Sequence, residues 1–329
     1  MQHALNATTS QINIRHLMAI YLVLPAVLVL YIVDKMYFGS IRMLMPYKPE
    51  DLAFWIYIFG MPHVFASFFL LADKEYLRHF SRRLWVSAVI LLALPPLVAW
   101  GLGWWVLQVI FTCMIVYHTV AQQFGVALMV GKRRPDLLHK INTFLGSVAG
   151  VAIYLLIYAD GDLLTVVLHN ERLWRDVCHV LVAIVVLLST WEIVWHDNRN
   201  WRIYMGLNAL LLVTMDLLMS QDLTFLIVVT GRVVHEFTAW QIYMHHDHNR
   251  NKTVRRNWIY ARLSWVKITP YWLGMLLAFG MGIAYTALMN STGSQALWFL
   301  TISFSLYHYW IEGFIWKGNS PPKHQLRVA

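Results

Sequence analysis

Charged residues are scarce in this chain. Asp, Glu, Lys and Arg make up 13% of its 329 residues, whereas 59% are hydrophobic. Soluble chains of this length often form two domains with charge-rich surfaces, so the shortage of charge argues against a soluble enzyme and favours an integral membrane protein. The sixteen Trp and sixteen Tyr residues agree with this interpretation, because these side chains gather at membrane–water interfaces.

Cysteine is equally scarce. Cys113 and Cys178 are the only two, and both lie in apolar stretches, which excludes a disulfide framework and a cysteine-based zinc site. The sequence also lacks internal repeats, low-complexity linkers and a soluble domain. The first apolar run, residues 17–33, has no small-residue cleavage site after it, so we interpret it as a retained span and not as a signal peptide.

Long apolar runs take the place of these missing features. About ten of them have the length needed to cross a bilayer. They predict an all-α fold, a polytopic transmembrane helix bundle that forms a single integral-membrane domain over residues 1–329. The predicted spans are residues 17–33, 52–72, 84–100, 104–130, 143–159, 177–195, 203–219, 223–244, 268–289 and 296–316.

Most Lys and Arg residues fall in the loops after the even-numbered spans. The loops after the odd-numbered spans hold only Lys35, Arg42, Lys48, Arg172 and Arg175. The positive-inside rule then places both termini in the cytoplasm, and we expect a bacterial inner (plasma) membrane. The net charge of +9 is thereby explained by topology and by contact with membrane lipids, without a nucleic-acid partner.

Four of the fifteen histidines lie inside predicted spans that all run in the same direction. His63, His118, His235 and His308 each stand about 8–12 residues before the cytoplasmic end of their span, or roughly 12–18 Å along a helix. Imidazole is the commonest protein metal ligand, so four of them at one depth predict a shared metal site. All-nitrogen coordination suits iron, copper or zinc and argues against calcium or magnesium.

Three of these histidines have a polar residue next to them or one helical turn away: Glu312 after His308, Gln122 after His118 and Glu236 beside His235. We expect the three to orient the imidazoles or to take part in the chemistry. Arg232, one turn before Glu236, is a candidate to neutralise it. Pro62 predicts a kink beside His63 that opens room in the bundle.

The other histidines fall mainly in termini, loops or span ends, and we predict that they are solvated or interfacial: His3, His16, His79, His139, His169, His179, His196 and His324. The run His245-His246-Asp247-His248 follows span eight in a polar segment. We interpret it as a solvated interfacial segment, with a metal-entry or secondary metal site as the alternative.

The order of these motifs resembles the Brp/Blh family of integral-membrane, β-carotene 15,15'-dioxygenase-like proteins. The matching elements are GMPH ending at His63, YHTVAQQFG around His118, VVHEF around His235 and YHYWIEGFIWK around His308. The resemblance implies a membrane-embedded, four-histidine site for non-haem Fe(II) that uses O₂ on an apolar substrate. Ala239 stands where the family pattern has a further histidine, so the substrate is either carotenoid-like or another lipid.

Three other functions remain open at this point. A diiron lipid desaturase or hydroxylase would carry HxxHH motifs, which the sequence lacks. A bis-histidine haem protein that carries electrons needs two facing histidines. A transporter with histidines on its path would be expected to show repeat symmetry. We therefore expect an O₂-dependent oxidoreductase of the dioxygenase type that takes a lipophilic substrate from the bilayer.

Overall fold

The computed structural model describes residues 10–52, 54–158, 165 and 169–329. Within these residues the fold is all-helical and has no strand, as the sequence predicts. The helices are α2 (Ile14–Ala19), η1 (Ile20–Leu22), α3 (Val23–Met36), α4 (Ser40–Leu44), η2 (Pro49–Asp51), α5 (Trp55–Ile58), α6 (Met61–Leu70), α7 (Lys74–Gly101), α8 (Trp104–Gly131), α9 (Leu137–Tyr158), α11 (Glu171–Val194), α12 (Arg199–Met219), α13 (Thr224–Asn251), α14 (Trp258–Arg262), α15 (Pro270–Thr292), α16 (Gln295–Ile315) and η3 (Lys323–Gln325).

The chain divides into two compact units. Unit 1 is drawn from Met1–Asn13, Ala53–Leu97 and Glu236–Ala329, and unit 2 from Ile14–Leu52 and Val98–His235. Two helices, α7 and α13, contribute residues to both units. In α13 the division falls between His235 and Glu236, so the predicted site residues are distributed over both units.

Seven segments of the described chain are long and apolar enough to cross a membrane: Ile14–Met36, α7, α8, α9, α11, α12 and α15. The chain is therefore a membrane protein, but the predicted count of ten spans is not confirmed. The remaining three predicted spans correspond to α5 with α6, to α13 and to α16. Helix α6 has ten residues, or about 15 Å of length. Helices α13 and α16 contain ionisable and aromatic residues that lower their mean hydropathy.

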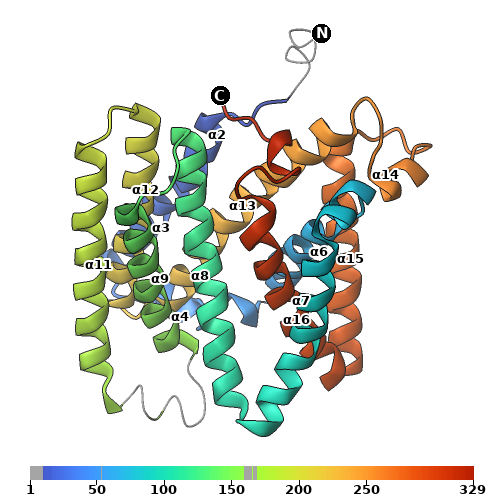
Figure 1. Ribbon diagram of the computed structural model, residues 1–329. Helices are drawn as coiled ribbons and strands as arrows, with labels where there is room; N and C mark the ends of the chain where they lie inside the picture. The colour runs from blue at the N-terminus through green and yellow to red at the C-terminus, as the bar shows by residue number, and fades with distance from the viewer. Residues whose placement is uncertain (1–9, 53, 159–164, 166–168) are drawn as a thin grey trace. The chain divides into compact units, whose positions relative to one another are not determined.

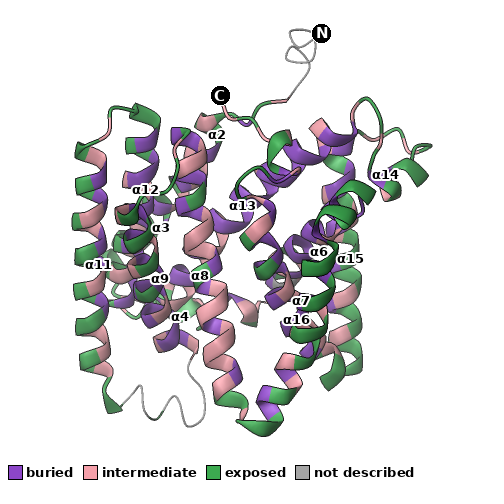
Figure 2. Ribbon diagram, viewed as in Figure 1, coloured by how far each residue is buried: buried purple, intermediate pink, exposed green. Residues whose placement is uncertain are grey.

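Unit 2 is a group of long helices in which α9 contacts α8 and α11, and α12 contacts the same two helices (Figure 1). Glycine permits one close approach, because a Cβ on Gly150 of α9 would lie 2.7 Å from Cγ1 of Val116 in α8. The face of α11 turned away from these contacts is exposed and apolar (Figure 2). Leu187 there is 69% exposed, as expected for a side chain that meets lipid.

Helix α6 is the core of unit 1. It packs against α15 and α16, and nine of its ten residues are buried. Figure 2 shows the same run of buried residues along α6. The contact with α15 requires glycine, since a Cβ on Gly282 would lie 2.6 Å from the backbone nitrogen of Pro62. This close packing fixes the first turn of α6, where His63 stands.

Unit 1 also ties the two ends of the described chain together. Ile12 and Val328 form a parallel β-bridge, in which the Ile12 N–H donates to the carbonyl of Arg327 at 2.8 Å. Asn249, near the end of α13, accepts from the Ser10 N–H at 2.7 Å and donates to the carbonyl of Gln325 at 2.8 Å. The N-terminal segment, the C-terminal segment and the end of α13 therefore lie together.

Candidate metal centre

His63 lies in the first turn of α6. The helix begins after Gly60, whose φ of 106° favours glycine, and it carries Pro62 at its start. The predicted span 52–72 is thus interrupted between α5 and α6, just before His63, and Pro62 stands in the first turn of α6, where a missing N–H costs nothing. His63 is 2% exposed.

A second imidazole meets His63 from α16. The ring centroids of His63 and His308 lie 4.4 Å apart, and their planes cross at 83°. Glu312 follows His308 by one turn, as predicted, and all three side chains are buried. One ligand atom from each of His63, His308 and Glu312 lies within 4.8 Å of the others. We call these three residues the unit 1 triad.

Two further residues of α13 support the triad. The carboxylate of Glu236 has Oε2 at 3.7 Å from Nδ1 of His63, so this acid lies beside a histidine other than its predicted neighbour His235. Tyr243 donates a hydrogen bond from its hydroxyl to Oε1 of Glu312. Tyr243 could not be predicted from the sequence, because a tyrosine in an aromatic-rich span has no distinguishing pattern.

Unit 2 contains the other two predicted ligands as a pair. The ring centroids of His118 in α8 and His235 in α13 lie 5.0 Å apart with planes at 83°, and both side chains are buried. Gln122 lies one turn after His118, and its Oε1 is buried without a hydrogen-bond partner among the described residues. The grouping of all four histidines around one ion, and the pairing of Arg232 with Glu236, stay predictions.

The unit 1 triad fits a transition-metal ion by its donor chemistry and its size. Two atoms bound to one ion at about 2.1 Å each lie at most ~4.2 Å apart, so small side-chain rotations suffice to bring the three donors onto an ion. Two imidazoles with one carboxylate form the donor set of non-haem Fe(II) oxygenases when they occupy one face of the metal. The carboxylate also offsets part of the metal's charge, which neutral imidazoles cannot do. Glu312 thus fits as a ligand and not only as a supporting residue.

The histidine run at the end of α13 is not the solvated segment that the sequence predicts. Helix α13 continues to Asn251, and His245, His246 and Asp247 are 6%, 1% and 5% exposed. Nε2 of His246 lies 3.0 Å from the hydroxyl of Tyr76, and its Nδ1 lies 3.0 Å from Oδ1 of Asp247. These contacts satisfy both ring nitrogens of His246, so we assign this side chain a structural role.

Asp247 has a second partner, since the hydroxyl of Tyr260 donates to its Oδ2 at 2.5 Å. Burial, with the nearby Asp247 carboxylate, raises the pKa of Tyr260 well above its usual range. Tyr260 therefore stays a hydrogen-bond donor at any ordinary pH. We call Tyr76, His246, Asp247 and Tyr260 the α13-end network.

A third buried histidine lies in unit 2. His139, predicted to be solvated or interfacial, is 3% exposed, and its Nδ1 lies 3.0 Å from Oε2 of Glu192 in α11. Asn142 donates to Oε1 of the same carboxylate at 2.8 Å. The prediction for His139 is thus wrong, because helix α9 begins earlier than the apolar run and buries its first turn against α11.

Comparison of the chain with family models, with curated proteins and with solved structures gave no match.

Proposed function

We propose that this chain is a membrane-embedded non-haem iron oxygenase that acts with O₂ on a lipophilic substrate, either carotenoid-like or another lipid. The observation that carries the proposal is the unit 1 triad: His63, His308 and Glu312, buried together in a membrane protein. Ionisable residues inside a membrane are costly and usually functional. Bound Fe(II) with open coordination positions would supply the activation of O₂.

The surrounding side chains have definite tasks in this proposal. Tyr243 holds the carboxylate of Glu312 in place through its hydrogen bond to Oε1. Trp240 meets His63 edge-on, with ring centroids 6.4 Å apart, and stacks on Phe279 at 5.0 Å. This aromatic wall keeps water away from His63, and a lipophilic substrate would reach the site from the bilayer.

We include His118 and His235 in the proposed site, as the sequence predicts. The basis for this part of the proposal is the sequence pattern, in which four histidines stand at a similar depth in their predicted spans. The same proposal places both termini and the segment 245–267 in the cytoplasm of a bacterium, because these parts hold many of the basic residues.

Metal analysis of detergent-purified protein tests the proposal. We expect stoichiometric iron in the wild-type protein and loss of most iron, with all O₂-dependent activity, in His63→Ala and in His308→Ala. His118→Ala and His235→Ala should do the same if the four histidines share one ion. His79→Ala is the matched control, since His79 is an exposed histidine of α7, and it should keep its iron.

Glu312→Gln tests whether the carboxylate is a ligand. Loss of iron as complete as in His308→Ala would make Glu312 a ligand, whereas a loss of 10–100-fold in affinity is typical of a supporting residue. Full iron content in both the His63 and the His308 variants would refute the metal centre. A Soret band in the absorption spectrum would instead establish a haem protein.

A further inference from the structure

Unit 2 contains a small cavity that the metal proposal does not use. It has a volume of about 30 Å³ and lies among α8, α9, α12 and α13. A water molecule needs roughly 10–15 Å³ of such space, so the cavity has room for one very small molecule and none for a lipid chain. Its wall is mostly aliphatic: Ile115, Val116, Val120, Leu211, Leu212 and Met215.

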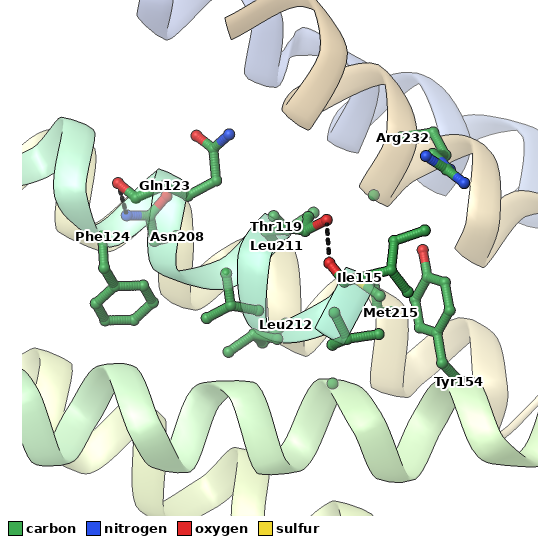
Figure 3. A pocket seen from close by; sticks show the side chains of 14 residues that line it. Ile115, Thr119, Gln123, Phe124, Tyr154, Asn208, Leu211, Leu212, Met215 and Arg232 are labelled. Carbon is green, nitrogen blue, oxygen red and sulfur yellow. Dashed lines mark hydrogen bonds between the residues drawn. The ribbon is translucent and has the colours of Figure 1, made fainter. Parts of the chain in front are cut away.

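The polar side chains at one end of the wall already have protein partners (Figure 3). Oε1 of Gln123 accepts from the hydroxyls of Tyr21 and Tyr204, at 3.0 Å each. Asn208 donates from Nδ2 to the carbonyl of Gln123 at 3.2 Å and accepts at Oδ1 from Tyr21.

Thr119, farther along the wall, donates from its hydroxyl to the carbonyl of Ile115 at 2.9 Å. A buried water needs two to four polar partners. These groups are engaged with one another, so a water molecule gains little by entering this part of the cavity. An apolar occupant is favoured there.

Several residues that line the cavity are close in sequence to His118 and His235. Val116 and Thr119 flank His118 in α8, and Gly231 stands one turn before His235 in α13. Figure 3 shows Tyr154 and Arg232 at the end of the cavity away from Gln123. Gly231 keeps this end open, because a Cβ there would lie 2.8 Å from the hydroxyl of Tyr154.

We infer that this cavity is a binding site for dioxygen, the smallest apolar reactant of the proposed reaction. The inference rests on the proposed oxygenase function for the identity of the gas, and on the size and lining of the cavity for the site itself. Apolar cavities in proteins take up small apolar molecules such as xenon, so xenon is a suitable probe that needs neither metal nor substrate.

The test is a crystal structure of the full chain under xenon pressure, with the anomalous signal locating the gas. We expect xenon between Val116 and Leu211 in the wild-type protein. Leu211→Phe should abolish this peak by filling the space. Leu210→Phe is the matched control, because Leu210 is the preceding residue of α12 and is 42% exposed; it should keep the peak. Val120→Leu, a smaller change, should lower the xenon occupancy if Leu211→Phe does not fold.

Steady-state kinetics at varied O₂ concentration then test whether dioxygen uses this site. Leu211→Phe should raise the KM for O₂ several-fold while kcat at saturating O₂ and the iron content stay unchanged. A wild-type structure with ordered water and no xenon in the cavity would overturn the inference and leave the oxygenase proposal standing. Xenon binding in a protein that consumes no O₂ would overturn the assignment to dioxygen together with the proposed function.

Discussion

Tyr243 contacts the candidate metal centre from outside the triad. Its hydroxyl donates to Glu312, and both side chains are buried. Removing a hydrogen bond to a charged group costs about 1.5–3 kcal/mol. We expect Tyr243→Phe to weaken metal affinity by roughly 10–100-fold, the usual effect of losing a partner of a metal ligand, as measured by titration of the apoprotein with Fe(II) under anaerobic conditions.

Tyr285→Phe serves as the control for this change. Tyr285 also belongs to unit 1, and its hydroxyl donates to the backbone carbonyl of Leu297 at 2.7 Å, away from the triad. This variant should keep the wild-type affinity. Equal affinities in Tyr243→Phe and in the wild-type protein would show that Glu312 needs no help from Tyr243.

The sequence predicted His63, His308 and Glu312 as residues of one site, but not the supporting contacts that come from other helices. His308 and Glu312 are four residues apart, so helical geometry alone places them on one face. By contrast, His139 and Glu192 are 53 residues apart, and no local pattern in the sequence connects them. Glu236 was identified through its neighbour His235, yet it lies beside His63, because consecutive residues of a helix point in different directions.

At the scale of elements, the end of α13 is an independent stabilising region. His246 has partners at both ring nitrogens in the α13-end network, Tyr76 and Asp247. His246→Ala leaves the hydroxyl of Tyr76 and the carboxylate of Asp247 with fewer partners in a buried region, at a cost of about 1–3 kcal/mol for each group left unsatisfied. We expect a lower melting temperature, measured by intrinsic fluorescence, with unchanged iron content.

His248→Ala is the matched comparison in the same turn of α13, because His248 is only half-buried. It should melt close to the wild-type protein. A complete loss of iron in His246→Ala would contradict the structural role and would make the α13-end network part of the metal centre.

The helices that sequence hydropathy found most easily are the ones that carry no ligand, apart from α8. Helices α9, α11, α12 and α15 show apolar runs long enough to cross a membrane. Helices α6, α13 and α16, which hold His63, His235 and His308, do not meet the same criterion. The physical reasons differ: α6 is apolar but only ten residues long, whereas α13 and α16 contain imidazole, carboxylate and other polar groups that lower their hydropathy. The overall helical fold was therefore predictable, and the exact number of crossings was not.

At the scale of the whole molecule, labelling of single cysteines tests the proposed topology. In a background with Cys113 and Cys178 replaced by Ser, we expect Val254→Cys to react only with reagents added from the cytoplasmic side. Val254 is 66% exposed and lies between α13 and α14. Leu102→Cys, in the turn between α7 and α8 and 63% exposed, should react only from the opposite side. Labelling of Val254→Cys from outside would overturn the topology.

The pairing of the N-terminal and C-terminal segments restricts the number of times that the chain can cross the membrane. Ile12 bonds to Arg327, and Ala329 donates to Ile12 at 3.1 Å, so we predict that the two terminal segments lie on the same side of the membrane. A chain whose two ends lie on the same side of a membrane crosses that membrane an even number of times. The seven candidate spans of the described residues are an odd number, so we predict at least one further crossing among α6, α13 and α16. Each of these three helices carries one of the four predicted histidine ligands.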